Sequence, residues 1–168
     1  MNDALTPRPN TVLLQAACLW ILLALVLAWC LVGLGYRVDP LPALFPGKYT
    51  RVLQAHLDLL IMSALLLGFY ASRVPLPWPS SWAMAIGAFT NSSLFLLMAL
   101  FPTMDPSIEQ GPHWSQGVYE VYQFASLSLT TFGFASAAIW IFRSTRRRPD
   151  RAGSAQPQTP GRVGEALR

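Results

Sequence analysis

Charge is scarce in this chain: of its 168 residues only 12% are Asp, Glu, Lys or Arg, whereas 53% are hydrophobic. Within the long apolar stretches the only carboxylates are Asp58 and Glu120. A soluble domain spreads charge over its exposed surface, and a disordered chain is poor in apolar residues, so the composition excludes both a water-soluble enzyme and a disordered chain. Cysteine is scarce as well. Cys18 and Cys30 lie about 18 Å apart along one helix, too far to pair within the chain, which excludes a disulfide-rich secreted domain.

Four apolar stretches predict an all-α, membrane-spanning four-helix bundle with short loops. They cover residues 11–34, 52–72, 81–101 and 116–142, and each has the ~20 residues that a helix needs to cross a bilayer. Glycine and proline between them mark the turns. The first stretch is too long for the apolar region of a signal peptide, so we interpret it as an anchor helix. We expect an N-terminal segment at 1–10, a transmembrane domain at 11–145 and a disordered basic tail at 146–168.

The basic residues predict how the spans are oriented in a cell membrane. With both termini in the cytoplasm, nine Lys and Arg residues lie inside and three outside, as the positive-inside rule requires. The net charge of +4 is concentrated in the run from Arg143 to Arg151, directly after the last span. Such a cluster contacts anionic lipid head groups. We therefore expect the lipid bilayer as a partner, and no nucleic acid.

Polar side chains are expected to gather in the outer half of the bundle. His56 and Asp58 lie about two turns into the second span, and Asn91 lies at a similar depth in the third. Polar groups in lipid are costly and often functional. His56 is either a core histidine bonded to a neighbouring helix or a ligand for a metal or haem iron. Asp58 shares a helix face with Gln54 and Arg51, which also allows a structural polar pair, and Glu120 is close enough to the span end to reach water.

Two patterns constrain how the helices meet. Small or polar residues at one-turn spacing predict a helix-packing stripe on the third span and another on the fourth; they are Ala83, Gly87 and Asn91, and Ser126, Thr130, Gly133 and Ala137. His56 and Asp58 are two residues apart and point about 160° from each other, so they cannot form a simple dyad. If one faces the bundle and the other a neighbouring subunit, the site lies at the interface of an oligomer.

Three short motifs resemble a family of small membrane isomerases. The segment Ala55-His56-Leu57-Asp58 resembles the Ala-His-Leu-Glu segment of hydroxylaminobenzene mutases. The segment from Gly87 to Asn91 resembles their Gly-x-x-x-Asn motif, and the segment from Ser126 to Leu129 their Ser-Leu-Ser-Leu motif. The layout of four spans is also similar to styrene oxide isomerase, which has a histidine in the second span and an asparagine in the third. The likeness covers approximately residues 52–148.

The resemblance implies an intramolecular isomerase that acts on a small aromatic substrate, an aryl hydroxylamine or an aryl epoxide. It also implies haem b with His56 as the iron ligand, at an interface in a homo-oligomer such as a trimer. Asp58 matches the acidic position of the mutases. Met62 and Phe95, however, replace an asparagine and a tyrosine of styrene oxide isomerase that would orient an epoxide.

We therefore predict His56 as the cofactor and metal ligand, and Asp58 and Asn91 as catalytic residues. The alternative is a non-catalytic haem-binding or structural membrane subunit in which His56 only holds helices together. A transporter fits least well, because the sequence shows neither an inverted repeat nor a central helix broken by glycine and proline.

Overall fold

The computed structural model describes residues 10–108 and 114–146, and within them every regular element is helical. Four helices are long and apolar enough to cross a membrane. They are α1 (Thr11–Gly35), α3 (Tyr49–Ala71), α4 (Trp78–Leu100) and α5 (Trp114–Arg146). Two short helices, α2 (Leu41–Leu44) and the 3-10 helix η1 (Pro102–Met104), interrupt the connections. The prediction of an all-α four-helix membrane bundle is confirmed.

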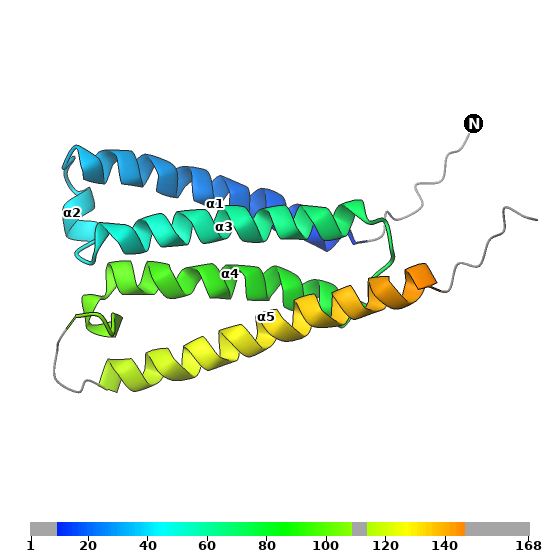
Figure 1. Cartoon of the computed structure of the whole chain (residues 1–168). Helices are drawn as coiled ribbons and strands as arrows, with labels where there is room; N and C mark the ends of the chain where they lie inside the picture. The colour runs from blue at the N-terminus through cyan, green and yellow to red at the C-terminus, as the bar shows by residue number, and fades with distance from the viewer. Residues whose placement is uncertain (1–9, 109–113, 147–168) are drawn as a thin grey trace, which may run out of the picture.

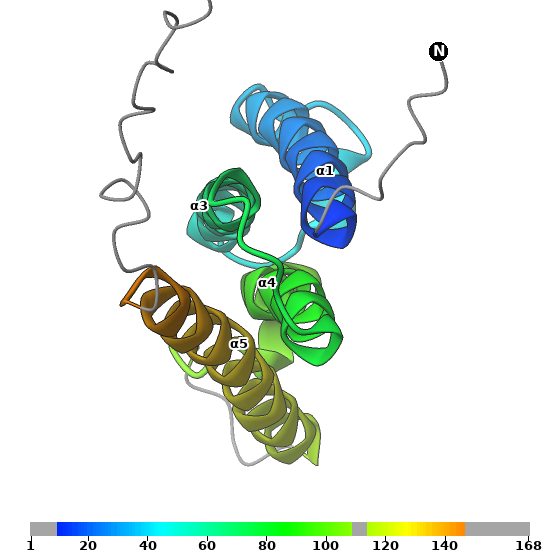
Figure 2. The same cartoon turned by 90° about the vertical axis from the view of Figure 1, so that its right-hand side faces the viewer.

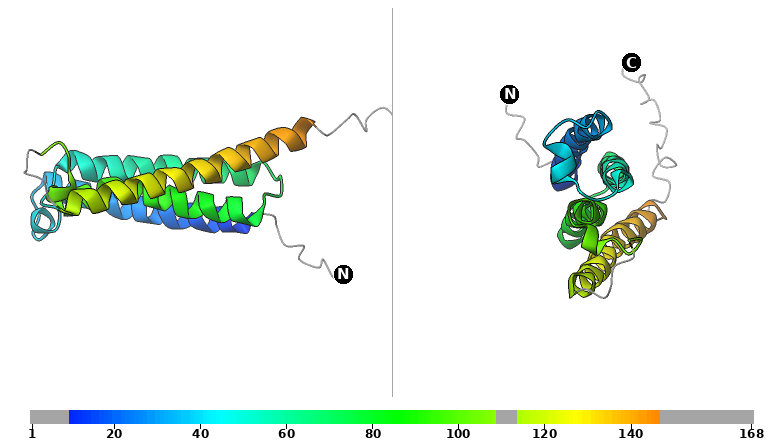
Figure 3. Two further views of the ribbon diagram at one scale, coloured as in Figure 1. Left: turned by 90° about the horizontal axis from the view of Figure 1, so that it is seen from below. Right: turned by 90° about the vertical axis from the view of Figure 1, so that its left-hand side faces the viewer.

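The helices run antiparallel in chain order (Figure 1). At one end of the molecule lie the start of α1, the connection between α3 and α4, and the end of α5; we call it the Arg73 end. At the opposite end lie α2, η1 and the starts of α3 and α5; we call it the Arg51 end. Viewed along the helices, α1 and α5 lie on opposite sides, with α3 and α4 between them (Figures 2 and 3).

The predicted span boundaries are correct to within a few residues, and the differences have simple causes. Helix α4 begins at Trp78 and includes Pro79 in its first turn, where a missing N–H costs no helical hydrogen bond. Helix α5 continues past the predicted limit at 142 to Arg146, because arginines are favourable in the last turn of a helix. The predicted segment 1–10, except Asn10, and the predicted tail beyond Arg146 lie outside the described residues.

Two buried clusters hold α1, α3 and α4 together. Near the Arg51 end, Leu27, Val52 and Leu59 pack with Ala99, and near the Arg73 end Leu13, Leu66 and Met84 pack together. Between them Trp20 of α1 stacks on Phe89 of α4 with ring centroids 4.6 Å apart. Its indole Nε1 donates a hydrogen bond to the carbonyl oxygen of Ala85 at 3.2 Å. The indole therefore satisfies its polar group inside an apolar contact.

Helix α5 is attached differently, because its extensive contacts with the other long helices are with α4 alone. The prediction of close packing along the small-residue stripes is confirmed. A Cβ atom added at Gly133 would lie 2.6 Å from the backbone N of Met84, and one added at Gly87 would lie 2.8 Å from Cα of Thr130. Only glycine allows the two backbones to approach so closely.

Candidate functional site

His56 lies on α3 and is half-buried against α1. Its ring Nδ1 is 2.8 Å from the carbonyl oxygen of Ala24. A carbonyl oxygen can only accept, so Nδ1 carries the proton and donates it. A neutral imidazole in this tautomer has its lone pair on Nε2, and among the described residues no hydrogen bond engages that atom. Histidines that bind metals are commonly oriented in this way, through a hydrogen bond from the other ring nitrogen.

Asp58 faces the other neighbour of α3. Its Oδ2 atom accepts a hydrogen bond from Asn91 Nδ2 at 2.9 Å and another from Ser92 Oγ at 2.7 Å, both on α4. Asp58 and Asn91, two of the predicted site residues, are therefore in direct contact. The pairing of Asp58 with Arg51 or Gln54 is not seen. Arg51 instead donates to Gln54 at 2.9 Å and to Asp105.

Hydroxyl groups continue this polar layer from α4 to α5. Ser93 Oγ and Tyr122 Oη are 2.7 Å apart, and Ser126 Oγ donates to Thr90 Oγ1 at 3.0 Å. One turn further, Thr130 Oγ1 donates to the carbonyl oxygen of Gly87 at 2.9 Å. Polar groups of α3, α4 and α5 thus lie close together, as expected, and whether they are in the outer half of a membrane stays a prediction. Many of these groups bond to each other across helices, which is also how polar groups stabilise a membrane bundle.

His56 and Asp58 border one exposed strip of α3 from its two sides. Each is about 100° around the helix from Leu57, whose side chain is 48% exposed, and Ile61 one turn further is 57% exposed. Within the described residues no hydrogen bond joins His56 to Asp58 or Asn91. A molecule or a second subunit lying against Leu57 would therefore meet His56 on one edge and Asp58 on the other. Glu120 is exposed, in line with a side chain that reaches water.

At the Arg51 end, Arg51 and Asp105 form an ion pair that was not predicted from the sequence. Arg51 Nε donates to Asp105 Oδ2 at 2.9 Å, and Nη2 donates to Oδ1 at 2.7 Å. Asp105 is 1% exposed and also accepts bonds from the backbone N and Oγ of Ser107. The hydrogen bond from Arg51 holds the pKa of the Asp105 carboxyl well below its usual range, with help from Ser107, although burial acts in the opposite direction. This fork joins α3 to the loop that leads to α5.

The ion pair predicts a loss of stability in acid. Because the folded pKa of Asp105 is depressed, its contribution is fully present above the unfolded value of about 3.9 and decreases as pH falls below it. We expect the thermal unfolding midpoint in detergent to fall between about pH 4 and pH 2. The Asp105→Asn variant should be destabilised at neutral pH by about 1–3 kcal/mol, because Arg51 keeps its bond to Gln54 but loses its charged partner. It should also lose most of this pH dependence; an unchanged pH profile in the variant would contradict the assignment to Asp105.

The side chains that could act as metal ligands limit the kind of metal centre that the chain could form. Among residues 10–108 and 114–146, no group of three or more His, Cys, Asp and Glu side chains is positioned to hold a metal ion. A zinc or non-haem iron site uses at least three protein ligands. Haem iron, in contrast, takes its protein ligation from axial positions alone, and a single histidine suffices. His56, with its oriented Nδ1 and unengaged Nε2, fits that requirement.

Sequence reasoning missed several residues that shape this region. Asp105 is separated from Arg51 by the whole length of two helices, and no local spacing relates them. Ser92, the neighbour of the predicted residue Asn91, makes the shorter bond to Asp58. The contacts of Trp20 with α4 could not be predicted from the sequence, because a tryptophan is a usual residue in a membrane span. Comparison of the chain with protein-family models, with curated proteins and with solved structures gives no match.

Proposed function

We propose that the protein is an integral membrane isomerase that rearranges a small aromatic substrate, an aryl hydroxylamine or an aryl epoxide, with haem b held by His56. The observation that carries the proposal is the hydrogen bond from His56 Nδ1 to Ala24, because it leaves the lone pair of Nε2 to hold an iron ion. The motif resemblance around His56, Asn91 and Ser126 supports the same chemistry. Ferric haem bound there would supply a Lewis acid for the substrate oxygen, and an isomerisation needs no external electron donor.

The residues of the chain have separate tasks in this proposal. His56 holds the cofactor, with its ring orientation fixed by Ala24. Asp58 is positioned by Asn91 and Ser92, which both bond to Oδ2, so Oδ1 remains to accept a proton from the substrate or to return one. Leu57 and Ile61 supply an apolar surface between the two groups. Such a surface excludes water, which would otherwise trap a reactive cation.

Oligomerisation belongs to the same proposal. His56 and Asp58 flank a strip of α3 that the other described helices leave uncovered. A second copy of the chain over this strip would enclose a substrate between His56 and Asp58, as the trimer in the resemblance implies. We place the termini in the cytoplasm, because the Arg73 end also carries Arg143 and Arg146.

Spectroscopy and turnover together test the proposal. Protein expressed with a haem supply and purified in detergent should show a Soret band. It should convert either phenylhydroxylamine to an aminophenol or styrene oxide to phenylacetaldehyde, without an added reductant. Met62 and Phe95, which are apolar where an epoxide would need polar partners, favour the hydroxylamine. A colourless protein that converts neither compound would refute the proposed isomerase activity. A Soret band without turnover would favour a non-catalytic haem-binding subunit.

A further inference from the structure

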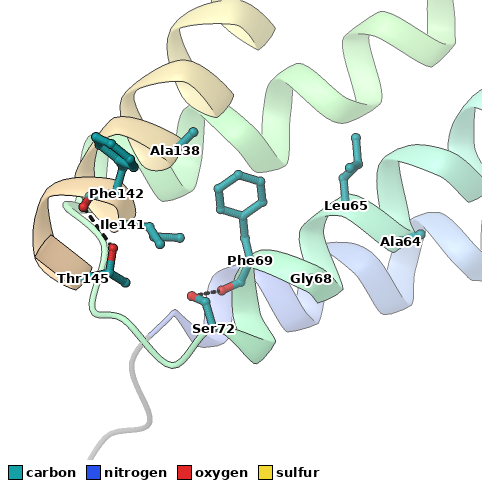
Figure 4. A pocket seen from close by; sticks show the side chains of 9 residues that line it. All are labelled: Ala64, Leu65, Gly68, Phe69, Ser72, Ala138, Ile141, Phe142 and Thr145. Atoms are coloured by element: carbon teal, nitrogen blue, oxygen red, sulfur yellow. Dashed lines mark hydrogen bonds between the residues drawn. The ribbon is translucent and has the colours of Figure 1, made fainter.

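Two adjoining pockets lie between α3 and α5 at the Arg73 end, away from His56. The first has a volume of about 500 Å³ and is lined almost wholly by apolar side chains. Figure 4 shows Phe69 of α3 and Ile141 of α5 pointing into the space between the two helices. The pocket lies where the end of α5 comes near the end of α3 (Figure 2), with Phe69 of α3 and Phe134 of α5 edge to face at 5.7 Å between ring centroids. Its main lining residues are Leu65, Gly68, Phe69, Ala138, Ile141 and Phe142.

The second pocket continues the first toward the end of the helices and is more polar. It has a volume of about 530 Å³ and contains Arg73, Trp140 and Ser144. Ser72 and Thr145 line both pockets, so the apolar space passes directly into the polar one. A groove that changes from apolar to basic toward the end of a span is complementary to an anionic phospholipid, whose acyl chains are apolar and whose head group carries a negative charge.

The charge at this end is entirely positive within the part of the chain that the structure describes. Arg73 follows α3, and Arg143 and Arg146 occupy the last turn of α5. The acidic side chains among these residues are Asp39, Asp58, Asp105 and Glu120, and none belongs to either pocket. Arg146 lies 5.2 Å above the ring of Phe142, a lining residue of the first pocket. Arg146 itself lines neither pocket, so Arg73 is the cation in direct contact with the proposed site.

Three of the four other polar side chains that line the pockets already make hydrogen bonds. Ser72 Oγ donates to the carbonyl oxygen of Phe69, and Thr145 Oγ1 donates to that of Phe142. Trp140 Nε1 donates to the carbonyl oxygen of Pro75 at 3.0 Å. The guanidinium groups of Arg73, Arg143 and Arg146 make no ion pair with the described residues. The salt bridge found among these residues joins Arg51 to Asp105. Among the described residues, the side-chain donors that remain for a ligand are the Arg73 guanidinium and Ser144 Oγ, and a cation beside a hydroxyl favours a phosphate ester.

We propose that this double pocket binds one anionic glycerophospholipid, with an acyl chain between α3 and α5 and the head-group phosphate at Arg73. The occupant follows from charge complementarity, together with the continuity of apolar and basic surfaces in helices that span the bilayer. The bound lipid covers the face of α5 that α4 leaves bare. The inference goes beyond the proposed isomerase and uses none of its residues.

Lipid titration of detergent-purified protein, followed by native mass spectrometry, tests this site. Phosphatidylglycerol should be retained in preference to phosphatidylcholine. The Arg73→Asn variant should bind phosphatidylglycerol about fivefold more weakly. Arg37→Asn is the matched control, because Arg37 also follows a helix and both residues have φ of 55°, which asparagine accepts; it should leave binding unchanged.

A second pair of variants tests the apolar half. At Gly68 an added Cβ meets no atom within 4 Å, and the same holds at Gly35 near the other end. Gly68→Leu should therefore fold normally and abolish lipid retention by filling the pocket, whereas Gly35→Leu should not affect it. Inorganic phosphate should not displace the lipid. Equal retention of both lipids, displacement by phosphate alone, or equal effects of Arg73→Asn and Arg37→Asn would overturn the proposal.

Discussion

Replacement of Gly133 by leucine is expected to separate α5 from α4. An added Cβ would lie 2.6 Å from the backbone N of Met84 and 2.8 Å from the carbonyl carbon of Ala83. Backbone atoms of a helix cannot yield as a flexible side chain can, so the two helices must move apart. Overpacking of this kind costs about 1–3 kcal/mol or more. Here the effect should be at the upper end, since the extensive contacts of α5 are with α4 alone.

A cysteine pair can report this separation directly. Ser136 Oγ donates to Ser80 Oγ at 2.9 Å across the same contact, so Ser80→Cys with Ser136→Cys should cross-link readily once Cys18 and Cys30 are replaced by alanine. Adding Gly133→Leu should abolish the cross-link and lower the unfolding midpoint. Gly117→Leu is the matched control on α5, because an added Cβ there meets nothing within 4 Å. Cross-linking that persists in Gly133→Leu would show that the close contact is not needed.

Replacement of His56 by alanine is expected to remove the Soret band and the isomerase activity together. Loss of a partner that only orients a metal ligand lowers metal affinity by about 10–100-fold, and loss of the ligand itself should exceed that. The fold should persist, because the apolar clusters of α1 and α3 do not include His56. Haem content per protein and the visible spectrum are the measurements.

Chemical rescue distinguishes a ligand from a structural histidine. Imidazole added to the His56→Ala variant should restore part of the Soret band, since a free imidazole can occupy the position of the missing ring. Asp58→Asn serves as the comparison: it should retain haem and lose turnover, because Asp58 bonds to α4 rather than α1. If His56→Ala keeps its haem, the ligand assignment is wrong, even if activity falls.

The spans, and the depth of residues within them, could be predicted from the sequence because the thickness of the bilayer fixes the length of a spanning helix. A helix must carry about 20 apolar residues to cross the bilayer, so residues 11–34 and 81–101 stood out without knowledge of any partner. The antiparallel order of the helices then fixed the relative depth of their residues. Asp58 and Asn91 could therefore be predicted to lie at a similar depth. The close approach at Gly87 and Gly133 followed from small residues at one-turn spacing.

What escaped prediction depends on rotations and angles that hydropathy does not encode. The partner of Arg51 was sought on its own helix, at Gln54 or Asp58, because local spacing is all that a sequence displays. Asp105 lies in a connection whose path depends on η1, a turn of three residues. The pocket beside Gly68 depends on the angle at which α5 crosses α4 toward the end of α3, which no residue pattern specified. Whether His56 binds haem stays a prediction.

The attachment of α5 along a single neighbour has a mechanical consequence. A helix wedged between two others is fixed in tilt by both, but a helix fastened along one line can swing about that line at small energetic cost. The contact through Gly87 and Gly133 would be the line about which α5 turns, the ion pair of Arg51 with Asp105 tethers the connection at one end, and the contact of Phe69 with Phe134 limits the turn at the other. Swinging changes the width of the opposite opening beside Phe69. The thickness and composition of the host bilayer would then set the resting angle of α5.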